Sequence, residues 1–96
     1  MINDRRYDLR APLADTVNLS WTDQAGQKQH APADLADISR SGASARSKHA
    51  VKVGTILSFD YQDQQFAGKV TYCKTDASGF VLGIEFEDGY RWKPRL

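Results

Sequence analysis

Apolar and polar residues alternate along most of the chain, and this period-two pattern predicts a succession of short β-strands. The alternation is clear at Val17, Leu19 and Trp21, and it returns over residues 57–61, 66–72 and 80–86. No segment shows the 3.6-residue apolar period that is typical of an amphipathic helix. Short strands joined by turns favour a closed barrel or a small sandwich, so we expect an all-β fold.

The segments between these strands contain the residues that favour turns. Polar or glycine-containing stretches predict turns at residues 23–27, 63–64 and 76–79. A weaker strand is expected over residues 28–39, where Leu35 and Ile38 interrupt the alternation and indicate a β-bulge. Gly42 then opens a short segment of small residues, Ala43 to Ala45, and residues 47–52 are expected to form a loop.

The length of 96 residues limits the chain to a single domain with one modest core. Its content of 41% hydrophobic and 26% charged residues is ordinary for a globular protein. We expect an arginine-rich N-terminal arm over residues 1–12, a barrel over 13–90 and a short tail over 91–96. The sequence RRYDLR within the arm has the residues for one helical turn before Pro12 ends it.

Charge and cysteine content exclude several classes of protein. The net charge of +1 argues against a general binder of nucleic-acid polymers, although arginines and lysines gather at both ends of the chain. The single cysteine, Cys73, excludes an intramolecular disulfide. No apolar run approaches the roughly 20 residues of a membrane span, and the first residues lack the apolar core of a signal peptide. We therefore expect a cytoplasmic protein without membrane insertion.

Two short clusters carry candidate binding chemistry. In the first, Arg6 and Arg10 stand four residues apart with Arg5 in front of them. Guanidinium groups bind phosphate oxygens and the O6/N7 edge of guanine. The second cluster is the run 37–42, DISRSG. Its aspartate can accept hydrogen bonds from the adjacent N1–H and N2–H₂ groups of guanine, which adenine lacks. Together the clusters describe a site for an anionic guanine nucleotide.

Each cluster also has a simpler interpretation. An arginine pair is commonly a solvated surface feature, because charged side chains tend to stay exposed. Asp37 and Ser39 can instead bond to nearby backbone and stabilise a turn, while Gly42 can supply backbone freedom.

The order of the two clusters along the chain resembles the PilZ domain family. Tyr7 lies between the arginines, Gly42 is followed by alanine, and the segment Val53-Gly54-Thr55 precedes a strand. Gly83 lies within the last apolar segment, which is similar to the final strand of that family. This resemblance covers essentially the whole chain. It implies a six-stranded antiparallel Greek-key barrel, here with little or no C-terminal helix.

The resemblance also implies a ligand, cyclic di-GMP, and a role for each motif residue. Arg6 and Arg10 would bind its phosphates and guanine edges, and Asp37 and Ser39 would bind a guanine. Gly42 would shape the turn. An arginine at the position of Arg5 is associated in the family with a stacked ligand dimer. The interpretation that follows is a receptor domain, not an enzyme, that orders its N-terminal arm on ligand binding and signals to an unidentified protein partner.

Two other functions compete with the receptor interpretation. One rival is a PilZ-like adaptor that binds no nucleotide; the other is a barrel for single-stranded nucleic acid, which would need exposed aromatics along a basic groove.

His30 and His49 lack partners at the spacing of metal ligands, so no metal or cofactor is expected. Cys73 is expected to be structural. Trp92 has two open roles, as a plug of the barrel or as a platform on which a base stacks.

Overall fold

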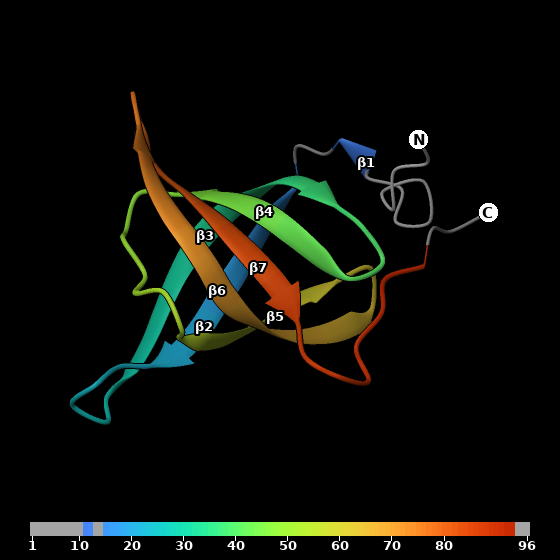
Figure 1. Ribbon diagram of the computed structural model, residues 1–96, viewed down its shortest axis with the longest axis horizontal. Coiled ribbons are helices and arrows are strands. Elements are labelled where there is room, and N and C mark those ends of the chain that lie inside the picture. Colours follow the sequence, from blue (N-terminus) through green and yellow to red (C-terminus); the bar gives the residue numbers. More distant parts are fainter. Residues whose placement is uncertain (1–10, 13–14, 94–96) are drawn as a thin grey trace, which may run out of the picture.

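Every regular element in the computed structural model, which describes residues 11–12 and 15–93, is a β-strand (Figure 1). Side chains along these strands alternate between buried and exposed, as period-two patterning requires. The strands are β1 (Ala11–Pro12), β2 (Thr16–Thr22), β3 (Lys28–Ile38), β4 (Gly42–Ser47), β5 (Ile56–Tyr61), β6 (Gln64–Asp76) and β7 (Gly79–Phe86). No helix of the described residues is long and apolar enough to cross a membrane.

Six of the strands close into an antiparallel barrel, which confirms the predicted fold. Their order is β3-β2-β5-β6-β7-β4, and pairing of β4 with β3 closes the ring. The segments β2-β3-β4 and β5-β6-β7 are each a meander, and the connection over residues 48–55 carries the chain across one end of the barrel. The short strand β1 pairs with the far end of β3, where Ala11 lies opposite Ile38 and Pro12 opposite Asp37.

The barrel interior is filled by the apolar side chains that the alternation predicted. Three phenylalanine rings stack at its centre, with centroids 5.4 Å apart for Phe59 and Phe66 and 4.8 Å apart for Phe66 and Phe86. Leu19 and Leu82 have no exposed surface. Aromatic pairs at these separations add stabilisation beyond the burial of their area, so this cluster anchors strands β5, β6 and β7 to one another.

The structure differs from the sequence prediction mainly at β4. The residues GASARS form a strand that is buried on both faces at its start, between β3 and β7. The run has no contrast between large apolar and polar side chains, so its period-two pattern is invisible in the sequence. The predicted bulge in β3 is present as a register shift between Leu35 and Asp37. The turn between β5 and β6 lies at Gln62 and Asp63, one residue earlier than expected.

Gly42 is required where β4 approaches β7. A Cβ atom added to it would lie 2.5 Å from the carbonyl oxygen of Ile84. Gly42 has no positive φ, so the reason for glycine here is this close approach and not an unusual backbone conformation. The backbone of β4 therefore sets how tightly the barrel closes.

The seam between β2 and β5 is the sparsest in the ring. These strands pair at Ser20 with Ser58 and at Trp21 with Leu57, and they diverge beyond. At the β1 end of the seam, the hydroxyl of Tyr61 donates a hydrogen bond of 2.8 Å to the Asp15 carboxylate. Burial and then this bond to Asp15 raise the pKa of Tyr61 above its ordinary value. The phenol thus joins the two strands where their backbones no longer pair.

We expect Tyr61→Phe to lower the free energy of unfolding by about 1 kcal/mol at neutral pH, because it removes this hydrogen bond. The wild-type chain should lose stability as pH rises above about 10, since the unfolded state releases the Tyr61 proton before the folded state does. Below that pH the contribution is fully present. Denaturant unfolding across the alkaline range measures both effects, and the alkaline loss should be smaller in the variant. An unchanged pH dependence would show that Tyr61 contributes nothing to it.

We expect Gly42→Ala to lower the free energy of unfolding by about 1–3 kcal/mol, the usual cost of forcing an extra carbon into a packed interior. The added Cβ has to displace a backbone carbonyl of β7, which cannot move without disturbing the ladder. Thermal unfolding followed by circular dichroism measures the change. Gly26→Ala serves as the comparison, because Gly26 has open space around it and only its positive φ of 81° opposes a side chain. Equal stability of Gly42→Ala and wild type would contradict the close-approach argument.

Candidate functional site

The run 37–42 forms the tight connection between β3 and β4. The backbone N–H of Ser39 donates to the Gly42 carbonyl at 2.8 Å, and the Ser39 hydroxyl donates to the same oxygen at 3.2 Å. Ser39 is fully buried, whereas Arg40 and Ser41 form the exposed tip. In this structure Ser39 therefore has the turn-stabilising role that the simpler interpretation of the motif proposed.

Asp37 lies just before this turn and is half-buried. Its Oδ2 atom accepts a hydrogen bond of 2.9 Å from the Ser44 hydroxyl on β4. Because the bulge falls between Leu35 and Asp37, the carboxylate belongs to the row of side chains that points out of the barrel. The bond to Ser44 holds the carboxylate in one orientation on that outer face.

A single outward row crosses four strands from Asp37. Register pairs it with Ser44 on β4, Ser44 with Gly83 on β7, and Gly83 with Tyr72 on β6. The Tyr72 ring covers the face of Gly83, since a Cβ added to Gly83 would collide with it. The ring is 38% exposed, and the Lys74 ammonium lies 4.9 Å from its centroid. A fixed carboxylate and an accessible aromatic ring therefore share one surface.

A shallow hollow of about 260 Å³ lies on this face of the barrel. Its walls come from β4, β6 and β7, at Ser41, Gly42, Ala43, Thr71, Tyr72, Gly83, Ile84 and Glu85. This volume is just below the range of roughly 300–1,000 Å³ typical of small-molecule sites. The hollow thus has room for part of a ligand, and Tyr72 is the aromatic side chain in its lining.

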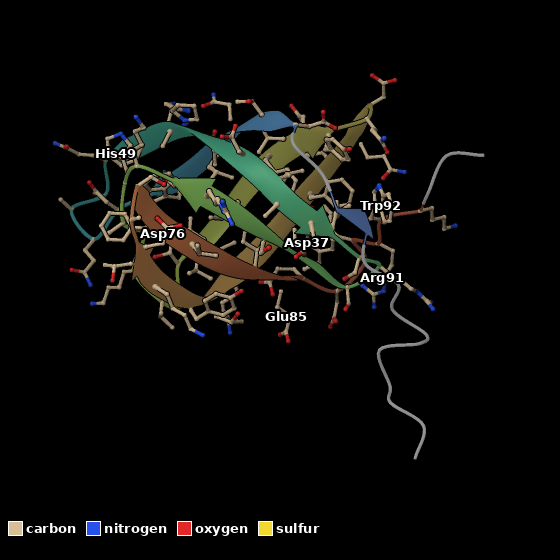
Figure 2. The ribbon with its side chains drawn as sticks, turned by 90° about the horizontal axis from the view of Figure 1, so that it is seen from above. Asp37, His49, Asp76, Glu85, Arg91 and Trp92 are labelled. Carbon is tan, nitrogen blue, oxygen red and sulfur yellow. The ribbon has the colours of Figure 1, made fainter. Side chains whose placement is uncertain are left out.

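The predicted site residues fall into three groups. Asp37 and Gly42 lie at this surface, and Ser39 lies beneath it in the turn. Arg5, Arg6 and Arg10 lie outside the described residues. The chain enters the sheet directly after Arg10, where Ala11 pairs with Ile38 beside Asp37. Asp37 and Trp92 lie toward the same end of the barrel, and His49 lies toward the other end (Figure 2).

Trp92 takes the first of its two open roles. It is 7% exposed, belongs to the core, and donates a hydrogen bond of 3.1 Å from Nε1 to the side chain of Gln62. Its backbone N–H also lies 3.3 Å from the Arg40 carbonyl. The indole therefore packs against the barrel beneath the motif turn and is not an exposed stacking platform here.

Tyr72 and Ser44 share the outer row of Asp37, although the sequence did not mark either as a candidate residue. The alternation of Phe66, Gly68 and Val70 predicts that Tyr72 points into the barrel, and this prediction is wrong, because a register shift between Val70 and Tyr72 turns the side chain outward. The pairing of a strand glycine with an aromatic residue, Gly83 with Tyr72, is a signal that appears only once register is known.

The remaining polar candidates lie in ordinary hydrogen-bonding and packing environments. His30 shares a hydrogen bond of 3.1 Å between its Nδ1 atom and the Ser20 hydroxyl. Cys73 is half-buried and packs against the core. Within residues 11–12 and 15–93, no three histidine, cysteine or acidic side chains gather as a metal site requires.

Comparison with known families agrees with the fold and the motifs. A family model described as the PilZ domain matches residues 4–90, which includes both clusters and all strands of the barrel. Comparison with curated proteins gives no match. The match extends over most of the chain, and the chain belongs to the PilZ domain family.

Proposed function

We propose that this PilZ domain is a receptor for cyclic di-GMP, the ligand that domains of this family generally bind. The observation that carries the proposal is the pairing of β1 with β3. Ala11 and Pro12, which directly follow the arginine cluster in the sequence, lie opposite Ile38 and Asp37 of the second motif. This pairing supports the proposal that the two clusters form one site.

The phosphates of the ligand are the proposed partners of Arg6 and Arg10. A cyclic dinucleotide carries two phosphodiester charges, and guanidinium groups bind such oxygens through paired hydrogen bonds that are stronger than neutral ones. Arg5 is proposed to stack on or neutralise a second ligand molecule, which gives two ligands per chain.

Base recognition is assigned to the outer row that begins at Asp37. Its carboxylate offers acceptors to the N1–H and N2–H₂ groups of guanine, and the Ser44 hydroxyl keeps it oriented. Tyr72 provides an exposed ring at the other end of the row, on which a base can stack. Ser39 and Gly42 are proposed to support this surface by fixing the turn and the β4 backbone beneath it.

Ligand binding is proposed to order the N-terminal arm against the barrel. Fixing the backbone of a residue costs about 1–2 kcal/mol, so ordering a long segment would consume most of the gain from a few arginine contacts. The pairing of Ala11 and Pro12 with β3 shortens the segment that has to be fixed. The surface formed jointly by arm and barrel would then be presented to a partner protein.

Arg6→Ala and Arg10→Ala are each expected to weaken cyclic di-GMP binding by about ten- to a hundredfold, because each removes charge-assisted hydrogen bonds to the ligand. Isothermal titration calorimetry measures affinity, and its saturation point should give two ligands per wild-type chain. In hydrogen exchange, the amides of residues 5–10 should gain protection only when ligand is present.

Lys52→Ala is the control for these variants, since Lys52 is exposed on the connection at the other end of the barrel. It should bind like wild type. Unchanged affinity in both arginine variants would overturn the site. The absence of any binding by the wild-type chain would favour the adaptor that binds no nucleotide. Equal protection of the arm with and without ligand would show that it is preformed.

Asp37→Ala is expected to remove discrimination between guanine and adenine. The wild-type chain should bind cyclic di-AMP far more weakly than cyclic di-GMP, because adenine lacks the donor pair and leaves the carboxylate without it. The variant should lose about ten- to a hundredfold in affinity for cyclic di-GMP and little for cyclic di-AMP. Asp34→Ala is the matched control, an exposed carboxylate on the same strand that accepts a bond from Thr16. Equal wild-type affinity for the two dinucleotides would remove Asp37 from base recognition.

A further inference from the structure

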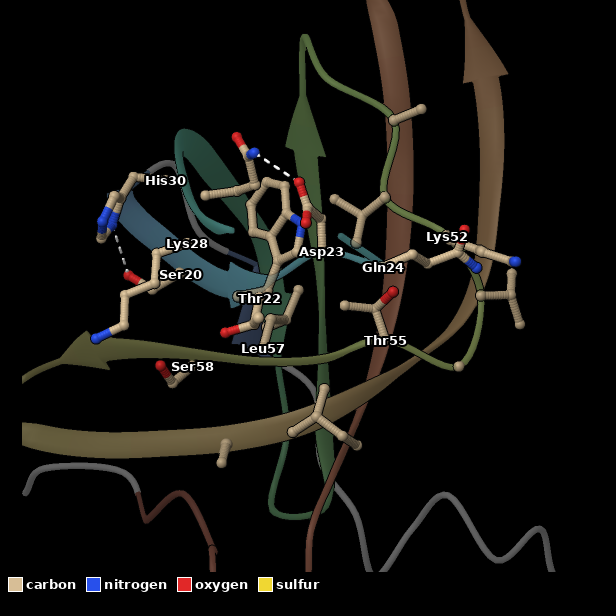
Figure 3. A pocket seen from close by; sticks show the side chains of 18 of the residues that line it. Ser20, Thr22, Asp23, Gln24, Lys28, His30, Lys52, Thr55, Leu57 and Ser58 are labelled. Carbon is tan, nitrogen blue, oxygen red and sulfur yellow. Dashed lines mark hydrogen bonds between the residues drawn. The ribbon is translucent and has the colours of Figure 1, made fainter. Parts of the chain in front are cut away.

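A second and larger depression lies at the end of the barrel away from the motif turn. It is an open groove of about 1270 Å³ between the diverging strands β2 and β5, bordered by the 23–27 turn and the connection over residues 50–55 (Figure 3). It exceeds the size typical of a small-molecule pocket and contains no residue of the 37–42 motif. The groove therefore needs an explanation separate from nucleotide binding.

Apolar side chains are unusually accessible in this groove. Among the described residues, three large hydrophobic side chains are classed as exposed, and two of them, Val53 at 55% and Ile56 at 45%, line it. Half-buried Trp21 on β2 also lines the groove. Clustered exposed apolar side chains mark interaction sites on soluble proteins, and tryptophan is enriched among residues that dominate binding energy.

The charges around these side chains are mainly basic. Lys28 and Lys52 extend from opposite sides of the groove, and His30 lies on the Lys28 side (Figure 3). The one acidic side chain in the lining, Asp23, is already bonded to the backbone N–H groups of Ala25 and Gln27 and to the Gln29 amide. The bond from the Gln27 N–H, followed by that from Gln29, lowers the pKa of Asp23. Asp23 therefore stays ionised at the 23–27 turn, and the two lysines still leave the lining with an excess of positive charge.

We propose that this groove binds an extended segment of a partner protein, with apolar side chains against Trp21, Val53 and Ile56 and acidic side chains near Lys28 and Lys52. The lysines stand on either side of the apolar floor, so an apolar centre flanked by carboxylates is the complementary sequence. Desolvation of the floor supplies affinity, and the flanking charges supply orientation.

Charge argues against an occupant from this chain itself. A symmetric contact between two copies would bring the same basic groove face to face, with like charges opposed. The first ten residues carry three arginines against two aspartates, and Arg91 and Lys93 are also basic. An acidic segment from another protein is therefore the better match.

A library of random peptides selected against the immobilised full chain tests the proposal, with affinities of the enriched peptides measured by fluorescence anisotropy. Enriched peptides should combine acidic and apolar residues and should bind more weakly at high salt. Val53→Ser combined with Ile56→Ser should weaken them by at least about tenfold. Lys28→Glu combined with Lys52→Glu should disfavour them and select basic peptides instead. These side chains are exposed, so the variants should stay folded, as circular dichroism checks.

Tyr72→Ser is the matched control, because Tyr72 is the third exposed large hydrophobic and lies outside the groove. It should bind the selected peptides like wild type. The groove variants, in turn, should bind cyclic di-GMP like wild type, so failure of the nucleotide proposal leaves this test intact. Enrichment of basic peptides by the wild-type chain, equal binding to the groove variants, or no enrichment would overturn the proposal. Self-association lost in the groove variants would assign the surface to a second copy instead.

Discussion

The close approach of β4 to β7 is the constraint on which the rest of this barrel depends. The ring closes through a strand whose first four residues, Gly42 to Ala45, have almost no side-chain volume. Only 2.5 Å separates the ideal Cβ position at Gly42 from a carbonyl oxygen of β7. Because β4 is thin, Leu35 of β3 and Leu82 of β7 lie on either side of Ala45 and complete the core across it. Larger side chains on β4 would separate β3 from β7 and loosen the packing between them. A chain of 96 residues has little other core that could make up for the lost packing.

This constraint divides the second motif between structure and recognition. Ser39 and Gly42 are occupied within the turn and the β4–β7 contact, whereas Asp37 is displaced by the bulge onto the outer face. Under the proposed function, a substitution at Ser39 or Gly42 would therefore act on binding through the shape of the surface. A substitution at Asp37 acts on the group that would meet the ligand.

The sequence predicts those parts of the molecule that depend on contrast between neighbouring residues. The strands around Phe59, Phe66 and Ile84 follow from alternation, and the bulge in β3 follows from its interruption. By comparison, β4 could not be predicted, because glycine, alanine and serine offer no contrast and its burial comes from two partner strands. The sequence could not decide whether Trp92 is buried or exposed, because its burial depends on how the C-terminal residues pack against the motif turn.

Surfaces that depend on the register between strands could not be predicted from the sequence either. Tyr72 joins the candidate site only because three pairings place it in the row of Asp37, and each is a long-range choice of partner. The groove lies where the backbone pairing between β2 and β5 ends. No local pattern in the sequence marks the residue at which these two strands separate.

The distribution of pairing around the ring also indicates where such a barrel can change shape. The stacked phenylalanines and the paired strands β5, β6 and β7 form a packed unit, and packed interiors resist gradual deformation. The β2–β5 seam differs, with two residue pairs where β2 and β3 have seven. One end of that seam opens into the groove. The other is held by the bond between Tyr61 and Asp15, three residues after the strand that carries the N-terminal segment into the sheet. Regions with few pairings open at the lowest free energy, so the β2–β5 seam is the part of the ring expected to open most easily.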